Sequence, residues 1–306
     1  MRVFVTGASG FIGTAVVQEL RDAGHQVLAL ARSDESASAL AERGVEVHRG
    51  SLDDPESLAA GASRSDGVIH LAYNHDFVDM AAAAVTDLHA VNAMGEALAG
   101  TDRPLVIASG TLMLTLGFSS PLGRAGTEDD EPELPGPRID SARSLATFAR
   151  RGVRTSSVRL APTVHGPGDH GFVARLISIA RDQGVAAYVG TGENRWPAVH
   201  RLDAARLFRR ALEEGPANSH WHGVGEEGVP FRLISETIGR HLDLPVVSVS
   251  SEAAMDHFGF LGGLVQLDNP TSNALTRERL GWRVENPSLV EDLDAGHYFD
   301  EASASA

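Results

Sequence analysis

The stretch Thr6-Gly7-Ala8-Ser9-Gly10-Phe11-Ile12-Gly13 follows the apolar run Val3–Val5 and opens a segment with helical periodicity. Its glycines permit a tight turn, a close approach of the backbone to a pyrophosphate and close packing of a helix on a strand. The start of that helix adds free N–H groups and the positive end of its dipole. This order predicts the first unit of a doubly wound parallel α/β sheet with a dinucleotide site, and a tight turn without a ligand is the alternative.

The first half of the chain alternates short β-branched runs with segments of helical period, as βαβ units do. We expect six parallel strands joined by right-handed crossovers, which is a Rossmann-type domain over residues 1–160. The predicted strands are Arg2–Thr6, Gln26–Ala31, Val45–Arg49, Gly67–Leu71, Leu105–Ala108 and Thr155–Leu160. The predicted helices are Phe11–Ala23, Ser36–Arg43, Pro55–Ala60, Asp76–Ala99 and Asp140–Arg151.

The pattern changes after Leu160, where Gly and Pro become frequent and strand–helix pairs no longer recur at regular spacing. This predicts a smaller α+β substrate lobe over residues 161–300, with residues 195–215 returning to the first domain. Its predicted elements are a helix over Pro230–Leu242, a strand over Pro245–Ser250 and a closing helix over Leu289–Phe299. The small polar tail 301–306 is expected to fray.

Composition excludes several classes of mechanism and partner. The 306 residues include no Cys, and all 26 basic residues are Arg. Disulfides, thiolate zinc sites, cysteine nucleophiles and lysine Schiff bases are therefore excluded. The formal charge of −15 opposes binding to nucleic acid or anionic lipid. His220 and His222 share one face of a predicted strand, but spacing shows no third ligand, so we expect no metal.

The N-terminus and the apolar runs indicate a location. Met1 leads straight into Val3–Val5, without the charged region and apolar run of a signal peptide. No stretch approaches the roughly 18 apolar residues of a membrane helix. We therefore expect a cytoplasmic protein that does not associate with membranes.

Five stretches carry, by their order and spacing, a resemblance to a known family. They are the T-G-x-x-G-x-x-G loop, D-x-V-x-H-x-A at Asp66–Ala72, N-x-x-G at Asn92–Gly95, Arg159 with Gly166–Gly168, and V-H-x-x-D-x-A at Val199–Ala205. Together they resemble the extended short-chain dehydrogenases/reductases, the NAD-dependent epimerase/dehydratase group. The resemblance implies a Rossmann domain with a nicotinamide dinucleotide, a small-molecule substrate in the second lobe, and a homodimer through the helices near Ala81–Ala99 and Asp140–Arg151.

The resemblance also implies cofactor contacts on the glycine loop and at the end of the fourth predicted strand. These contacts are Gly7, Ser9, Gly10, Phe11, Ile12, Gly13, Leu71, Ala72 and Tyr73. The turn Gly50–Asp53 resembles the adenine-flanking turn of the family, which adds Ser51 and Leu52. Ser51 departs from the pattern, because the family has Asp there.

The residues after the second predicted strand favour NADP(H) over NAD(H). An NAD site usually holds an acidic residue there, bonded to the ribose 2′-hydroxyl. This chain has Arg32 and Ser33, and a guanidinium can pair with a 2′-phosphate. Asp34 and Glu35 argue the other way, and Arg32 as a solvated surface charge is the alternative.

The proton-transfer pair of the family, a Tyr with a Lys four residues later, is missing. The chain has no Lys, and its three tyrosines lie elsewhere. Ile139 and Arg143 occupy the two places by spacing, and Arg143 is expected to hold the nicotinamide ribose without titrating. The companion hydroxyl of the family corresponds to Ser109 or Thr111, for which a local turn contact is the alternative.

Several residues are candidates for the missing acid or for the substrate wall. Tyr73 is the leading proton donor because it follows the fourth predicted strand, and a pocket-lining aromatic is the alternative. His165 is a second candidate, since imidazole titrates near neutrality, and Asn92 is implied to hold a water. The predicted substrate wall is made of Tyr73, Met113, His170, Trp196 and His200. Structural histidines and a core tryptophan are the alternatives for the last three.

Three functions follow, in order of preference. The first is an NADP(H)-dependent oxidoreductase that moves hydride between nicotinamide and a carbonyl or alcohol, with a non-standard proton donor. The second is a dinucleotide-binding sensor or scaffold without catalysis. The third is a nucleotide-sugar epimerase or dehydratase, which is disfavoured because those reactions use the missing Tyr–Lys pair.

Overall fold

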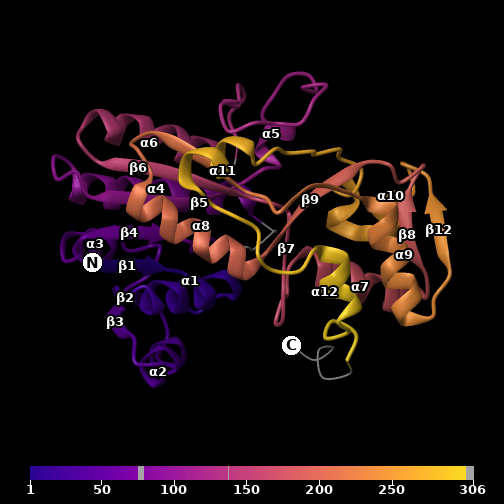
Figure 1. Ribbon diagram of the computed structural model, residues 1–306, viewed down its shortest axis with the longest axis horizontal. Helices are drawn as coiled ribbons and strands as arrows, with labels where there is room; N and C mark the ends of the chain where they lie inside the picture. The colour runs from indigo at the N-terminus through magenta and orange to yellow at the C-terminus, as the bar shows by residue number, and fades with distance from the viewer. Residues whose placement is uncertain (75–78, 137, 301–306) are drawn as a thin grey trace.

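A computed structural model describes residues 1–74, 79–136 and 138–300 of the chain, and within them seven strands form one parallel sheet (Figure 1). Its order is β10-β6-β5-β4-β1-β2-β3. The bounds are β1 (Arg2–Thr6), β2 (Gln26–Ala31), β3 (Glu46–Arg49), β4 (Gly67–His70), β5 (Pro104–Gly110), β6 (Arg154–Leu160) and β10 (Ser219–Gly223). The order reverses between β1 and β4, which is where doubly wound sheets bind ligands.

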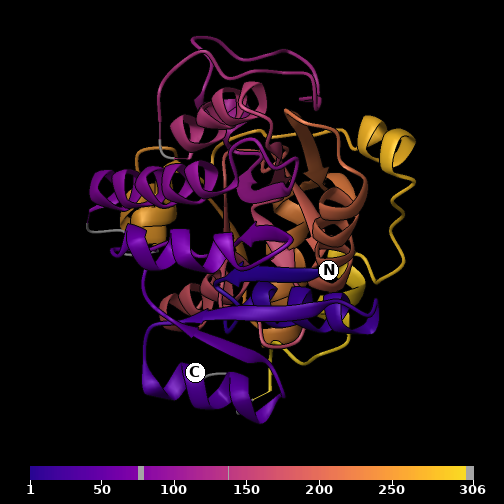
Figure 2. The same cartoon turned by 90° about the vertical axis from the view of Figure 1, so that its left-hand side faces the viewer.

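Helices cover both faces of this sheet, as the parallel pairing requires. One layer holds α1 (Phe11–Asp22), α2 (Asp34–Glu42) and α8 (Arg201–Glu214). The other holds α3 (Pro55–Ser63), α4 (Met80–Leu98) and α6 (Ile139–Arg150). Figure 2 shows the helices on either side of the strands. The predicted fold class is confirmed. The predicted start of α4 at Asp76 lies outside the described residues, as does the tail 301–306.

The prediction of six strands was one short. The seventh strand, β10, pairs in parallel with β6 although the sequence places it in the second lobe. A strand was expected at His220 and His222, but its sequence S-H-W-H-G has Trp221 as the single large apolar residue, so no pattern assigned it to this sheet. Trp221 is fully buried in the core of the first domain, and this burial fixes the strand at the edge of the sheet.

The C-terminal lobe combines two small sheets with short helices. One sheet joins β7 (Thr163–His165), β9 (Arg195–His200) and β11 (Glu226–Pro230), and β8 (Ala186–Val189) pairs with β12 (Val246–Val249). The helices of this lobe are α7 (Phe172–Gln183), α9 (Phe231–Leu242), α10 (Ala254–Phe258), the 3₁₀ helix η1 (Gly259–Gly263) and α12 (Leu289–Asp294). Two further helices belong with the first domain: α5 (Met113–Leu116) follows β5, and α11 (Ala274–Leu280) packs on α8 and β10. The closing helix is shorter than predicted, because Gly296 adopts a left-handed backbone soon after Asp294.

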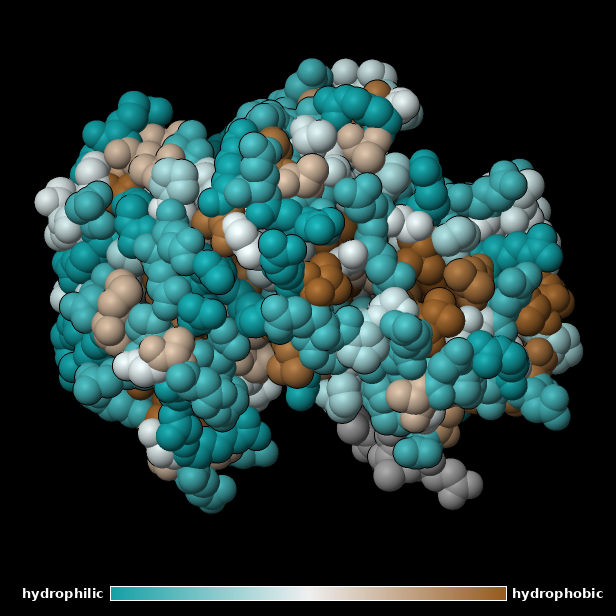
Figure 3. All heavy atoms as spheres, viewed as in Figure 1, coloured by the Kyte–Doolittle hydropathy of each residue, from teal (hydrophilic) through white to brown (hydrophobic). Residues whose placement is uncertain are grey.

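The surface differs between the two parts of the molecule. On the face shown in Figure 3, hydrophilic residues dominate over the first domain, and apolar ones gather over the C-terminal lobe. Exposed apolar side chains of this lobe are Leu233, Val246, Met255 and Phe260. No helix of the described ranges has the length and apolar character needed to cross a membrane.

Candidate active site

The glycine loop packs directly on the end of β4. Gly7 has φ +70°, and a Cβ there would lie 2.7 Å from the Ala72 backbone nitrogen, so only glycine fits. At Gly10 the nearest atom to a built Cβ is the Gly7 carbonyl oxygen at 3.4 Å. The side of the loop at Gly10, where α1 begins, is therefore open for a ligand to approach the backbone.

A buried chain of polar side chains runs beneath this edge of the sheet. The Thr6 Oγ1 lies 2.7 Å from His70 Nδ1, and His70 Nε2 lies 3.2 Å from Asp87 Oδ1 on α4. Ser141, from the first turn of α6, donates to the other oxygen of Asp87 at 2.6 Å. A carboxylate only accepts, so His70 donates to Asp87 through Nε2, and its Nδ1 pairs with the Thr6 hydroxyl. These hydrogen bonds connect the glycine loop to α4 and α6.

Tyr73 and Arg138 meet at the same edge. The guanidinium carbon of Arg138 lies 4.0 Å from the centre of the Tyr73 ring, within the range of a cation–π contact. Arg138 also donates to the carbonyl oxygen of Ala108 on β5 at 2.7 Å. Sequence reasoning missed Arg138, because it is adjacent to the place assigned to Ile139. A signal was present, since a cation at the start of a helix opposes the helix dipole.

The charges around Tyr73 act on one another. Burial would raise the pKa of Asp87, but the hydrogen bond and charge of His70, the charge of Arg138 and the Ser141 hydroxyl bring that pKa below its usual range. Burial raises the pKa of Tyr73, which the positive charge of Arg138 opposes and the negative charge of Asp87 reinforces. Tyr73 is thus a protonated phenol at neutral pH, and Asp87 is a carboxylate.

A second arginine lies beside the glycine loop. The Arg201 guanidinium carbon lies 5.2 Å from the centre of the Phe11 ring, and the His170 ring meets Phe11 edge-on at 5.9 Å. The Arg201 Nε is buried and has no hydrogen-bond partner among the residues that the structure describes. Sequence reasoning missed Arg201, although it directly follows His200 in a stretch already singled out.

The end of β2 presents the predicted residues of the 2′-phosphate site. Arg32 is exposed there, and the Ser33 hydroxyl caps α2 by accepting from the Ser36 backbone. Arg49, at the end of β3, donates to the Ser33 carbonyl oxygen at 2.6 Å and to Asp34 at 2.8 Å. Arg49 was not predicted, and it balances the charge of Asp34.

The adenine-flanking turn keeps its local contacts. Ser51 Oγ accepts from the Asp53 backbone nitrogen at 3.3 Å, and Leu52 packs against the core cluster beneath α3. The turn leads directly into α3, whose N-cap is Asp54. Ser51 and Leu52 therefore sit in a defined turn beyond β3, and their contact with adenine stays a prediction.

The two candidate hydroxyls at the end of β5 differ. The Thr111 side chain is fully buried and donates to Asn269 Oδ1 at 2.9 Å, while Asn269 donates back to the Thr111 carbonyl oxygen at 3.0 Å. Ser109 lies on β5 beside the Ala108 carbonyl that Arg138 binds. Met113 follows in α5 and is half-buried. The structure thus gives the Thr111 hydroxyl a structural partner.

The structure corrects the expectation for Arg143. Its guanidinium donates to the carbonyl oxygens of Pro132 and Glu133, both at 2.7 Å, and lies 3.6 Å from Asp140. Arg143 therefore secures the segment before α6. Ile139 is buried in the first turn of α6. Arg138 contacts Tyr73 and the Ala108 carbonyl oxygen from a left-handed backbone (φ 63°), and the contacts of Arg143 lie elsewhere.

Two predicted wall residues, Trp196 and His200, and the candidate acid His165 have structural partners. Trp196 is fully buried between Phe172 and Phe231 in the core of the C-terminal lobe, which corrects its place in a substrate wall. The buried His165 binds Asp292 of α12 through Nδ1 at 2.8 Å, which joins β7 to the closing helix. His200 caps α8 by accepting from the Leu202 nitrogen, and its ring meets that of His165.

The state of His200 and the place of Asn92 complete the predicted set. Burial, helped by the neighbouring His165, lowers the pKa of His200, so His200 is neutral at physiological pH. Asn92 is half-buried on α4, more than one turn beyond Asp87. Its role in holding a water stays a prediction.

A Ser–His–Glu arrangement lies at the far edge of the sheet. Ser157 Oγ is 2.6 Å from His220 Nδ1, and His220 Nε2 is 2.9 Å from Glu131. Ser157 lies in β6 opposite His220 in β10 and is fully buried. The contact therefore joins two strands, and the serine is no accessible nucleophile.

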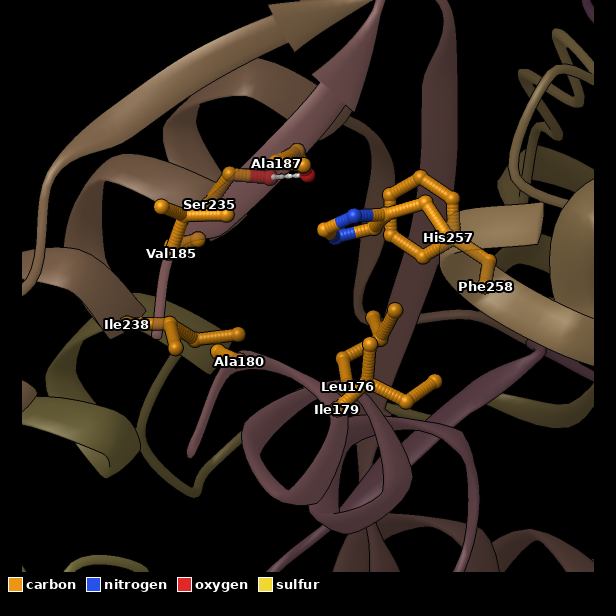
Figure 4. Close-up of a pocket in the computed structure, with 10 residues that line it drawn as sticks. Leu176, Ile179, Ala180, Val185, Ala187, Ser235, Ile238, His257 and Phe258 are labelled. Carbon is orange, nitrogen blue, oxygen red and sulfur yellow. Dashed lines mark hydrogen bonds between the residues drawn. The ribbon is translucent and has the colours of Figure 1, made fainter. Parts of the chain in front are cut away.

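The cavity drawn in Figure 4 belongs to the C-terminal lobe alone. It lies between α7, β8, α9 and α10, and the His257 ring points into it. Its volume of about 10 Å³ holds at most one water molecule. None of the predicted site residues lines it, so it is not the predicted substrate site.

The sequence of this chain is similar to those of known proteins. The model of the NAD dependent epimerase/dehydratase family matches residues 3–109. An uncharacterized protein of Schizosaccharomyces pombe is 49% identical over 300 residues, covering 98% of this chain and 100% of that protein. The chain belongs to the extended short-chain dehydrogenase/reductase family. The protein is accordingly an NAD(P)-dependent oxidoreductase or epimerase of this family.

Two further relatives extend this family assignment. The 2-alkyl-3-oxoalkanoate reductase of Stenotrophomonas maltophilia is 29% identical over 224 residues, covering 70% of this chain and 66% of that protein. Among solved structures, UDP-glucose 4-epimerase of Thermotoga maritima superposes with a TM-score of 0.75 at 21% identity, covering 98% of both chains. The likeness to the epimerase shows the fold that members of this family share.

Proposed function

We propose that this protein is an NADP(H)-dependent carbonyl reductase in which Tyr73 is the proton donor. The observation that carries the proposal is the contact of Tyr73 with Arg138 at the end of β4, where the glycine loop packs on Ala72. An acidic hydrogen thereby lies beside a dinucleotide loop, which is the pairing that carbonyl reduction needs.

The residues present fit a dinucleotide. The open side of Gly10 admits a pyrophosphate to the N–H groups at the start of α1. The buried Nε of Arg201 beside Phe11 lacks a partner among the described residues, and a phosphate oxygen would satisfy it. A bound reduced nicotinamide supplies the hydride.

The charge distribution near the ribose supports NADP(H). Arg32 is exposed at the end of β2, where a 2′-phosphate would lie. The ion pair between Arg49 and Asp34 partly offsets the negative charge that would repel this phosphate. The proposal therefore assigns the 2′-phosphate to Arg32, with Arg49 next to it.

Tyr73 completes the reduction by moving one proton. As hydride adds to the carbonyl carbon, the phenol O–H of Tyr73 gives its proton to the carbonyl oxygen, which yields the alcohol and a phenolate. The phenolate regains a proton from water. Ser109 is the proposed companion hydroxyl, since Thr111 donates to Asn269. Met113 and His170 are the proposed substrate contacts.

The substrate class follows from the site and from the relatives. A ketone or aldehyde without a diphosphate suits this chain, whose formal charge is −15. The relative from Stenotrophomonas is by name a reductase of a 3-oxo acid, which supports a ketone substrate.

Two measurements on one preparation test the proposal. Fluorescence titration first measures NADPH binding, and NADPH oxidation is then followed against a panel of ketones, aldehydes, quinones and imines. We expect turnover of at least one ketone, reduced about 100-fold or more in Tyr73→Phe with unchanged NADPH affinity. Full activity of Tyr73→Phe contradicts the role of Tyr73, and tight NADPH binding without turnover across the panel favours a dinucleotide sensor.

A further inference from the structure

We propose that Arg138 is the positioning residue of Tyr73 and supplies the positive charge that stabilises its phenolate. The inference rests on the proposed function and deepens it, because the chain has no lysine to supply this charge. Arg138 directly precedes α6 and is not one of the two positions, Ile139 and Arg143, that correspond to the Tyr and Lys of the family motif.

Two contacts and one neighbouring charge hold the guanidinium in place. It lies over the Tyr73 ring at 4.0 Å, and it donates to the Ala108 carbonyl oxygen at 2.7 Å. The negative charge of Asp87 acts on it from α4, and Asp87 is itself held by His70 and Ser141. Elements β4, β5, α4 and α6 thus converge on one cation beside one phenol.

The backbone of Arg138 carries a cost that this arrangement offsets. Its φ of 63° lies in the left-handed region, which is unfavourable for a non-glycine residue. It also precedes α6, where the helix dipole disfavours a positive charge. An Asn would relieve the strain, and a carboxylate would suit the dipole. An arginine here is explained by what its side chain reaches.

Arg138 and Tyr73 have different roles in the proposed reaction, because their side chains titrate differently. A guanidinium stays charged at any pH at which the protein works, so Arg138 does not itself give up the proton. An opposite charge within about 4 to 6 Å favours the charged form of a titrating group, here the phenolate. Tyr73 therefore moves the proton, and Arg138 lowers the free energy of the state that follows.

The first test reads the phenol directly and needs no substrate. The chain has three tyrosines, and burial raises the pKa of Tyr298 far above the measurable range. In a Tyr188→Phe background, the ultraviolet absorbance of phenolate on alkaline titration therefore reports Tyr73. We expect Arg138→Asn to raise the pKa of Tyr73 by about one unit or more and Arg138→Lys to restore most of it.

Two controls separate this effect from damage to the fold. Asn adopts the left-handed backbone readily, so Arg138→Asn removes the charge without added strain, and circular dichroism verifies the fold at each pH. Arg150→Gln removes a charge from the other end of α6, where Arg150 contacts Thr147, and should leave the titration unchanged. An unchanged pKa of Tyr73 in Arg138→Asn overturns the inference.

The second test uses the pH dependence of turnover on whichever carbonyl the panel identifies. We expect Arg138→Asn to lower kcat about 10-fold or more with little change in KM, and to move the alkaline limb of the kcat profile upward. A shifted phenol titration without turnover on any carbonyl supports the pairing and contradicts the proposed reductase. Turnover with an unshifted titration does the reverse.

Discussion

Thr111 and Asn269 are 158 positions apart in the chain and bind each other reciprocally, the Thr111 hydroxyl donating to Asn269 Oδ1 and Asn269 Nδ2 to the Thr111 carbonyl oxygen. Asn269 Nδ2 also donates to the hydroxyl of Thr115 at 2.8 Å. All these atoms lie at the end of β5, next to the proposed site. The segment 268–273 is thereby fastened to the first domain.

Removing this pair of hydrogen bonds should mainly lower the free energy of unfolding, with a smaller effect on turnover. Thr111→Val leaves the Asn269 amide with an unpaired oxygen in a buried place, so we expect a loss of about 1 to 3 kcal/mol in the free energy of unfolding. Asn269→Ala should cost a similar amount. Urea unfolding of both variants and of the double variant measures the coupling, and additive losses would show that the two residues do not act as a pair.

Two arginine variants should separate the two phosphate groups of the cofactor. Arg32→Ala should weaken NADPH binding about 10-fold or more and leave NADH binding unchanged, since it removes a contact to the 2′-phosphate alone. Arg201→Gln should weaken both cofactors by a similar factor, because both carry the pyrophosphate. Titration of each variant with both cofactors checks this. Equal losses for Arg32→Ala would remove its assignment, and an unchanged affinity for Arg201→Gln would place that side chain outside the site.

Gly10→Val should abolish dinucleotide binding and leave the fold intact. The built Cβ meets a neighbour at ordinary contact distance, so a side chain fits the protein and fills the space that the pyrophosphate would enter. Gly263→Val is a matched control in the C-terminal lobe, where no atom lies within 4 Å of the built Cβ. Binding titration and thermal unfolding check both variants, and retained affinity in Gly10→Val would place the cofactor elsewhere.

His222 should make the protein acid-sensitive. Burial, reinforced by the nearby charge of Arg159, lowers the pKa of His222 to about 3. The unfolded chain takes up a proton near pH 6.5, and the folded protein does so only near pH 3. Stability is therefore complete above pH 6.5 and falls as the pH drops toward 3.

A matched pair of variants isolates this effect. His222→Asn keeps a donor for the Ser272 carbonyl oxygen, which His222 Nδ1 reaches at 2.7 Å, and no longer titrates. We expect the fall in unfolding free energy between pH 7 and pH 5 to shrink in His222→Asn and to persist when the exposed His89 is replaced by Asn. The same fall in His222→Asn would mean that other groups cause it.

The sequence alone determined the architecture and the cofactor loop. A glycine loop between an apolar strand and a helix has few alternatives, because its φ values and close contacts are set locally, as Gly7 against Ala72 shows. Strand and helix periodicity located the first six strands, since periodicity reports which side of an element is buried. It did not assign β10 to this sheet, because Trp221 is the one large apolar residue of that strand.

The proposed catalytic groups were decided by the tertiary structure. Tyr73 was a candidate from its place after β4, but its partner Arg138 follows from how α6 packs against α4, β5 and β6. The same packing turned Arg143 away, buried Trp196 in a core and tied Thr111 to Asn269. Such contacts join residues that are far apart in the chain, so they cannot be predicted from local sequence patterns. Spacing located the edge of the sheet where we propose that the chemistry occurs, and packing selected the side chains that meet there.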